Sequence, residues 1–244
     1  MSRNFELLTQ LERESDVANR RPRPVTQGDV LKEAAAGTVG GVCGEEMLRL
    51  VQSVFLSTNG GSQRQVVFCG IDSESGSSSI CASAGRVLAA NSAQQVCLVD
   101  ANVRSQRLSH MFEVDTATPF SGHFASLREQ CVQIGGNLWL ARADMLADAS
   151  GSLHSADELK LLFASLRALF QFVLIDAPGA AVCGDAELLG QVADAAVLVI
   201  EANTTRRLTA HKAKESLEAA GVRLLGTVLH NRSFPIPEKL YKRI

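Results

Sequence analysis

The chain has 244 residues, of which 46% are hydrophobic and 20% are charged, and its formal net charge is -2 at pH 7. This composition excludes global disorder, and the near-neutral charge argues against a dedicated nucleic-acid-binding protein, because that role usually needs a basic face. The chain lacks an apolar stretch of roughly 18 residues and a signal-peptide start, which predicts a cytoplasmic protein or one peripheral on a membrane.

Residues 1–44 differ in composition from the rest of the chain. A basic segment at 20–24 is broken by prolines and is followed by a glycine-rich stretch at 36–44. This pattern predicts an N-terminal arm that is partly flexible, and residues 45–244 then form a single domain. The arginines of the arm are explained either as a solvated linker or as a contact with acidic lipid or a partner.

From residue 45 onwards, helical patterns alternate with short apolar runs. The helical patterns lie at 45–56, 78–90, 106–112, 156–170, 186–192 and 208–220, and the apolar runs lie at 66–69, 96–99, 138–140, 172–175, 196–200 and 224–229. Strands that are apolar on both faces and separated by amphipathic helices predict an α/β fold, with a mostly parallel central sheet and helices on both faces. In such sheets the functional site lies beyond the carboxyl ends of the strands.

The segment at 70–79 joins the first predicted strand to an alanine-rich helix, where a phosphate-binding loop belongs. Such a loop aims backbone N–H groups at phosphate oxygens, with a lysine on the β/γ-phosphates and a hydroxyl on magnesium. Gly76 and Ser78 stand at the positions of the glycine and the hydroxyl, and Ser77 stands at the position of the lysine. Taken alone, the segment is better explained as a Gly/Ser turn without a ligand.

Two carboxylates follow buried strands further along the chain. Asp100 comes directly after the run at 96–99, and Asp176 comes directly after the run at 172–175. One such aspartate is usually a turn residue or a helix cap. Two of them, in this order after a phosphate-type loop, favour a site that holds a metal ion or its water.

Together these motifs resemble the bacterial tyrosine kinases of capsule and exopolysaccharide synthesis and, more distantly, the MinD and ParA ATPases. The resemblance runs from about residue 45 to the end, and it is carried by the loop at 70–79 and by the segments LVDANVR, FVLIDAPG, VLVIEANTTRR, LEAAGVRLLGTVLHNR and PIPEKLYKRI. It implies a P-loop kinase fold of the MinD/ParA type. It also implies transfer of phosphate from magnesium-ATP to a C-terminal tyrosine cluster on a neighbouring subunit, activated by the cytoplasmic tail of a membrane chain-length regulator.

The resemblance also implies roles for single residues at the strand ends. The catalytic residues would be Asp100, as the first acid of a D-x-D motif, and Asp176, as the Walker B acid. Contacts to the nucleotide are implied for Gly70, Gly76, Ser77, Ser78, Ser79 and Asn231, with Asn231 near the adenine. Magnesium would be held by Ser78, Asp100 and Asp176. His230 precedes Asn231 at a strand end, a position that a surface turn explains equally well.

Three departures from the family pattern affect the chemistry. Ser77 replaces the lysine, Asn102 replaces the second acid of D-x-D, and the tyrosine cluster is reduced to Tyr241. Because no lysine lies between Lys32 and Lys160, an arginine would have to replace the missing cation.

The arginines after the predicted strands are Arg104, Arg206 and Arg207, which are either such replacements or ordinary surface residues. Asp72 and Glu74 add negative charge within the loop itself. Phosphoryl transfer relies on positioning and charge neutralisation. We therefore predict a pseudo-enzyme that binds ATP and magnesium weakly or not at all.

One helix bears on assembly and partners. Glu46 and Arg49 keep two elements of the E-x-x-R-x-x-R helix with which the family packs subunits into a ring, but Gln52 replaces the last arginine. Glu46 and Arg49 share a helix face, so they either pair with each other or contact a neighbouring subunit. Whether the protein is a monomer, a homo-oligomer or part of a mixed ring with an active paralogue stays open.

The sequence as a whole predicts a regulator or scaffold of bacterial exopolysaccharide or capsule biosynthesis and export. Its partner would be a membrane chain-length regulator or another export component, and no nucleic acid is expected. One alternative is an active autokinase or ATPase with a non-standard phosphate loop. The other is a MinD/ParA-like positioning protein.

Overall fold

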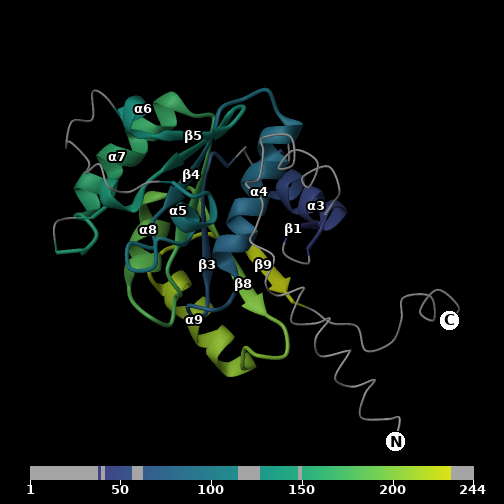
Figure 1. Cartoon of the computed structure of the whole chain (residues 1–244). Coiled ribbons are helices and arrows are strands. Elements are labelled where there is room, and N and C mark those ends of the chain that lie inside the picture. Colours follow the sequence, from purple (N-terminus) through teal and green to yellow (C-terminus); the bar gives the residue numbers. More distant parts are fainter. Residues whose placement is uncertain (1–37, 40–41, 57–62, 115–126, 148–149, 232–244) are drawn as a thin grey trace, which may run out of the picture. The chain divides into compact units, whose positions relative to one another are not determined.

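A computed structural model of the protein describes residues 38–39, 42–56, 63–114, 127–147 and 150–231, and Figure 1 shows their arrangement. Within these residues a seven-stranded sheet has the order β5-β6-β4-β7-β3-β8-β9. Neighbouring strands are parallel, except that β5 runs antiparallel to β6. The strands are β3 (Gln65–Gly70), β4 (Val96–Asp100), β5 (Val132–Gly135), β6 (Leu138–Ala141), β7 (Phe172–Ala177), β8 (Ala195–Glu201) and β9 (Leu224–His230). The predicted, mostly parallel sheet is confirmed.

Helices cover both faces of this sheet, as predicted (Figure 1). They are α3 (Gly44–Phe55), α4 (Ser77–Asn91), α5 (Arg107–Met111), α6 (Leu127–Gln130), α7 (Ala156–Leu169), α8 (Asp185–Val192) and α9 (Arg207–Ala219). Val66 and Phe68 of β3 pack with α3 and α4, whereas Val67 and Cys69 pack with α7, α8 and α9. Because successive side chains of β3 enter opposite helical layers, the strand is apolar along its length. Among the described residues, no helix is both long and apolar enough to cross a membrane.

The short elements β5 and α6 have no counterpart among the predicted ones. Each spans four residues, and β5 alternates half-buried with exposed positions at the edge of the sheet. A pattern of this length is too short to be distinguished from a loop. The pairing of β5 with β6, which includes an irregularity between Gln133 and Gly135, makes it a strand.

The predicted N-terminal arm lies only partly within the described residues. Residues 1–37 lie outside them, whereas β1 (Thr38–Val39) and β2 (Val42–Cys43) form an antiparallel pair. Helix α3 then begins at Gly44, one residue before the predicted start. The closing segment with Tyr241 also lies outside the described residues.

Helix α3 corrects one predicted contact. Arg49 donates to Glu45 at 2.9 Å, so of the two alternatives offered for Glu46 and Arg49, the pair between them is wrong. A glutamate four residues before a basic residue is the more favourable orientation on a helix. Both side chains of the pair are largely exposed, and Glu46 is exposed as well.

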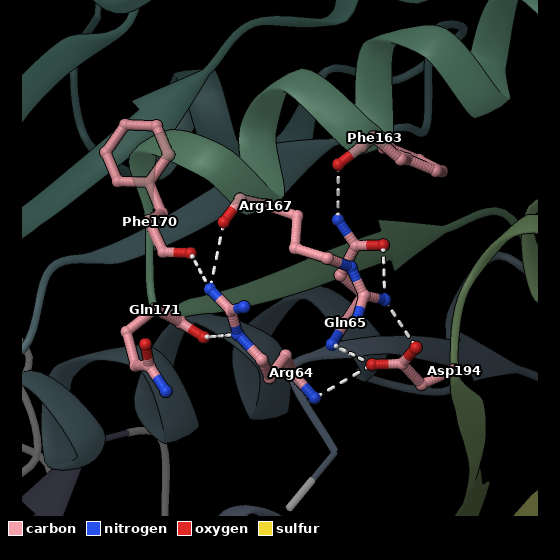
Figure 2. Close-up of polar contacts among 7 residues, drawn as sticks. All are labelled: Arg64, Gln65, Phe163, Arg167, Phe170, Gln171 and Asp194. Atoms are coloured by element: carbon pink, nitrogen blue, oxygen red, sulfur yellow. Dashed lines mark hydrogen bonds and ion pairs between the residues drawn. The ribbon is translucent and has the colours of Figure 1, made fainter.

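A polar network joins the start of β3 to the end of α7 (Figure 2). The Arg64 guanidinium donates to the backbone oxygens of Arg167, Phe170 and Gln171 at 2.9, 3.1 and 3.0 Å. The last carbonyl groups of a helix have no partner within the helix, and a cation complements the negative end of its dipole. Arg64, which directly precedes β3, therefore caps the carboxyl end of α7.

Asp194, in the turn before β8, completes the same network (Figure 2). Its Oδ2 accepts hydrogen bonds from the amides of Arg64 and Gln65, both at 2.9 Å, and its Oδ1 accepts one from Arg167. Burial raises the pKa of Asp194, but these hydrogen bonds outweigh burial and hold the pKa below its usual value. The network fixes the start of β3, the strand that leads into the loop at 70–76.

Candidate functional site

Three predicted parts of the site meet at the carboxyl edge of the sheet. β3 runs into the loop at 70–76, β4 ends at Asp100, and β7 carries Asp176 near its end. β7 lies between β3 and β4, and its register places Asp176 opposite Asp100. The two predicted carboxylates are therefore neighbours on adjacent strands.

Asp176 is completely buried, and burial raises its pKa to about 8. The Ser78 hydroxyl lowers the pKa, Asp100 raises it, and Arg107 and Ser77 lower it less. Among the described residues, neither oxygen of Asp176 accepts a hydrogen bond, so the two serines act by proximity. At neutral pH this acid is mostly protonated, and a magnesium ion would have to displace the proton.

Asp100 is also buried, but one of its oxygens has partners. Oδ2 accepts from the amide and the hydroxyl of Ser109 on α5, both at 2.8 Å, whereas Oδ1 has no partner among the described residues. Burial raises the pKa of Asp100, and Ser109 and the nearby His110 counteract part of this increase. Asp100 thus anchors α5 at the strand ends.

The loop between β3 and α4 is closed by its own side chains. The buried Ser75 hydroxyl accepts from the amides of Ile71 and Asp72 at 3.1 and 3.0 Å, and it donates to Asp72 Oδ1 at 2.7 Å. The same Oδ1 accepts from the amide of Glu74 at 3.0 Å. A phosphate-binding loop needs free amides. In this loop the amides of Ile71, Asp72 and Glu74 are already used.

The segment after β7 is hydrogen-bonded to the start of the loop. The amides of Ala180 and Ala181 donate to the carbonyl oxygens of Gly70 and Ile71 at 2.9 and 3.0 Å. A Cβ at Gly179 would lie 2.7 Å from the Asp72 backbone, so this close approach requires glycine. The FVLIDAPG segment therefore supports the loop as well as supplying a carboxylate.

Helix α4 begins directly after the loop. Gly76 is the residue before the helix, its φ is 76°, and no side chain caps the helix there. Ser77 and Ser78 are buried in the first turn, and Ser79 is half-buried. A helix N-terminus without a side-chain cap leaves N–H groups available to an anion. The first turn of α4 therefore keeps free backbone N–H groups, whereas the amides of Ile71, Asp72 and Glu74 in the loop are already hydrogen-bonded.

His230, the last residue of β9, packs against Gly76. A Cβ built on Gly76 would lie 2.3 Å from Cδ2 and 2.6 Å from Nε2 of the imidazole. His230 is only 8% exposed, and its Nδ1 is buried without a partner among the described residues. The surface turn offered as an explanation of His230 is therefore wrong, because pairing of β9 with β8 brings this residue to the loop.

Asn231 lies at the same edge, in the left-handed conformation with φ 54°. Its side chain donates to Glu201 Oε1, at the end of β8, at 3.1 Å. The contact of Asn231 with adenine stays a prediction, and the residue that contacts the loop is its neighbour His230. Gly70 ends β3, where a Cβ would lie 2.7 Å from Cβ of Ser75, so its immediate role is close packing.

Arg107, the first residue of α5, is exposed, and its charge lowers the pKa of Asp176. Among the predicted replacements for lysine, Arg104 is exposed and acts on a cysteine in the segment after β7. Arg206 and Arg207 are exposed at the start of α9. Sequence reasoning missed Arg107 because it does not directly follow an apolar run; it lies on the helix that Ser109 anchors to Asp100.

The site fits a cation better than it fits a triphosphate. Asp100 and Asp176 offer three buried oxygens without a partner, which is the type of ligand that magnesium prefers, and Ser78 lies nearby. In the described part of the chain, no three His, Cys, Asp or Glu side chains form a metal cluster, so water or phosphate would have to complete the shell. For the triphosphate, the lysine is absent and several loop amides are already bonded.

The chain matches no family model. It is 29% identical over 150 residues to the tyrosine-protein kinase YwqD of Bacillus subtilis, and this aligned region covers 60% of this chain and 63% of YwqD. It is 27% identical over 94 residues to the tyrosine-protein kinase CpsD of Streptococcus pneumoniae, which covers 38% of this chain and 41% of CpsD. The matches thus span less than two thirds of these relatives.

Solved structures share the fold. The kinase domain of the Escherichia coli tyrosine kinase ETK superposes with a TM-score of 0.69 at 18% identity, covering 90% of this chain and 86% of that one. The septum site-determining protein MinD from Pyrococcus horikoshii, complexed with Mg-ADP, gives 0.54 at 19% identity, covering 73% and 76%. The homologues of this chain are bacterial tyrosine-protein kinases, and its fold is that of the MinD/ParA P-loop ATPases.

Proposed function

We propose that the protein is a catalytically impaired relative of the bacterial tyrosine autokinases that regulates or scaffolds exopolysaccharide or capsule biosynthesis and export. The observation that carries the proposal is Ser77 in the first turn of α4, where a phosphate loop needs lysine. Homology to tyrosine-protein kinases supports the kinase-like part. The TM-score of 0.69 with ETK against 0.54 with MinD favours this reading over a positioning protein.

The charges around the loop support impaired nucleotide chemistry. Position 77 is neutral, and Asp72 and Glu74 are exposed carboxylates within the loop. At an effective dielectric near 20, a charge pair about 4 Å apart is worth about 4 kcal/mol before screening. Losing an attractive lysine therefore lowers phosphate affinity by orders of magnitude. Because phosphoryl transfer depends on charge neutralisation, we infer that ATP and magnesium bind weakly or not at all.

Restoring the cation is the sharpest test of this proposal. We expect the wild-type protein to show no magnesium-dependent ATP turnover and no tyrosine autophosphorylation. We expect Ser77→Lys to lower the Kd for ADP by about tenfold or more, because the new charge lies at the uncapped start of α4. Isothermal titration calorimetry with and without magnesium measures this change.

Ser73→Lys is the matched control, because Ser73 is an exposed residue of the same loop outside the first turn of α4. The control adds the same charge, so an equal gain in affinity would mean that only net charge matters. Turnover of magnesium-ATP by the wild-type protein, abolished in Asp176→Ala, would overturn the proposed impairment.

The partner that we propose is a membrane chain-length regulator or another component of polysaccharide export. The protein would then act in the cytoplasm, at the inner membrane, through that partner. The family resemblance of the strand-end motifs supports this partner.

We further propose that α3 mediates assembly. Glu46 and the ion pair of Arg49 with Glu45 are exposed on this helix, so they are accessible to a neighbouring subunit. We expect the wild-type protein to form a multi-subunit assembly, and Arg49→Glu to return it to the monomer mass of 26.1 kDa. Light scattering after size-exclusion chromatography measures both masses, with the exposed Arg207→Glu as control. A monomeric wild type would contradict self-assembly and leave the mixed ring as the proposal.

A further inference from the structure

The start of α9 carries positive charge that no neighbouring acid on the helix balances. Residues 206–214 include four lysine or arginine side chains and no acid, and all four side chains are exposed. Lys214 pairs with Glu218 at 3.4 Å. Arg206, Arg207 and Lys212 have no ion-pair partner among the described residues. These three cations are therefore accessible to an anionic partner.

The same cations stand at the unfavourable end of the helix. A helix N-terminus carries a partial positive charge, so acids in the first turn stabilise the helix and cations there destabilise it. The first turn of α9 has no acid, and Arg206, the residue before the helix, makes no side-chain cap hydrogen bond. The two acids of α9, Glu215 and Glu218, follow the basic segment. Helix stability therefore does not explain these charges, and a contact outside the domain explains them better.

Leu208, in the first turn of α9, adds an apolar group to this surface. It is 68% exposed, more than any other large hydrophobic side chain in the described part of the chain. Leu208 and Lys212 are four residues apart and lie on one side of the helix, whereas Ala213 and Leu217 are buried. A single exposed leucine is ordinary on a protein surface. Leu208 differs because it lies beside unpaired cations.

A second exposed leucine lies at the same end of the sheet. Leu229, on the edge strand β9, is 52% exposed. It is paired with Ile200 of β8, which packs against the core cluster shared with α7, α8 and α9. Paired residues of neighbouring strands point to the same face of a sheet, so Leu229 faces the layer of α9. Ile200 also lies next to the end of β8, from which the chain continues into α9.

These residues form one surface, which we call the α9 patch: Arg206, Arg207, Leu208, Lys212 and Leu229. We propose that the α9 patch binds the surface of an anionic lipid bilayer directly. The phosphate-bearing headgroups would balance the three cations, and the two leucines would enter the boundary between headgroups and acyl chains. A soluble polyanion offers negative charge but no apolar layer, so the combination of groups favours a membrane. This contact goes beyond the proposed function, in which a partner holds the protein at the membrane.

The test is co-sedimentation of the full chain with vesicles, without nucleotide or partner. We expect binding to vesicles made of equal parts of phosphatidylglycerol and phosphatidylcholine, and little binding to phosphatidylcholine alone. Lys212→Glu should lower the partition coefficient about tenfold or more, because it removes an attraction and adds a repulsion. Leu208→Ser should lower it about fivefold, because the apolar contact is lost.

Helix α7 offers a matched control for each variant. Leu161 is 63% exposed, and the neighbouring Lys160 is an exposed cation that pairs with Asp157. Leu161→Ser and Lys160→Glu make the same chemical changes outside the α9 patch, so both should bind vesicles like the wild type. Circular dichroism confirms that each variant is folded, which is expected because all four side chains are exposed.

Three results would overturn the proposal: no binding of the wild type to the mixed vesicles, equal binding to phosphatidylcholine alone, or equal losses in the α7 controls. A parallel titration with a duplex DNA oligonucleotide distinguishes a membrane from a soluble polyanion. DNA binding that depends on Lys212, together with vesicle binding that Leu208→Ser leaves unchanged, would assign the patch to a polyanion. Failure of vesicle binding would leave the proposed impairment of nucleotide chemistry unchanged, because turnover of magnesium-ATP is measured separately.

Discussion

Replacing Asp176 with asparagine is expected to make the protein more stable than the wild type above pH 8. Burial raises the pKa of Asp176 from 3.8 to about 8. The folded protein therefore binds this proton more tightly than the unfolded chain does. The resulting stabilisation is fully present below about pH 4 and is lost as the pH rises through 8.

The expected size of this effect is about 1.4 kcal/mol for each pH unit between 4 and 8, or about 6 kcal/mol in all. Because asparagine does not titrate, the free energy of unfolding of Asp176→Asn relative to the wild type should rise with pH at that slope. Any constant cost of the new amide shifts the curve without changing its slope. Urea unfolding at pH 5.5, 6.5, 7.5 and 8.5 measures the difference.

Asp157→Asn is the control, because Asp157 lies exposed in the first turn of α7. Its stability relative to the wild type should change little over the same range. Parallel curves for Asp176→Asn and the wild type would show that Asp176 is charged in the folded protein, and the raised pKa would be wrong.

Asp194→Ala is expected to destabilise the protein by about 3 kcal/mol at pH 7. The substitution removes the acceptor of the amides of Arg64 and Gln65 and the partner of Arg167 (Figure 2). An unpaired donor at a partly buried site costs about 1–3 kcal/mol. Because the Arg167 pair is partly exposed, its share is smaller than that of the amides.

The measurement is the free energy of unfolding in urea, with Asp157→Ala as control. Asp157 pairs with Lys160 at 3.3 Å on the exposed face of α7, so its loss should cost at most about 0.5 kcal/mol. A loss below about 1 kcal/mol in Asp194→Ala would mean that water replaces these contacts, and the network would not fix the start of β3.

The order of strands and helices could be predicted from local patterns. Central strands such as β3 and β7 are buried along their whole length, so each appears in the sequence as an unbroken apolar run. The loop at 70–76 and the aspartates Asp100 and Asp176 stand out for the same reason, because each follows such a run. Short edge elements such as β5 and α6 lack this signal, since tertiary pairing stabilises them.

Which residues surround the loop could not be predicted in this way. Parallel pairing brings strand ends together that lie far apart along the chain, and this places Asp176 beside Asp100. The same pairing buries His230 against Gly76, a contact that leaves no mark in the local sequence. Arg107, whose charge lowers the pKa of Asp176, lies on the helix that Ser109 anchors to Asp100.

The sequence alone established that a lysine is missing from a phosphate-type loop, because identity at position 77 needs no structure. Only the tertiary structure determined what surrounds that position: a loop whose amides bond to Ser75 and Asp72, and the side chain of His230 from the end of β9, which packs against Gly76. The physical reason is that the order of residues along the chain determines which residue stands at each position and which helices and strands form. The charges and hydrogen bonds of a site depend on distances between residues that are far apart in the chain, and only tertiary packing sets these distances.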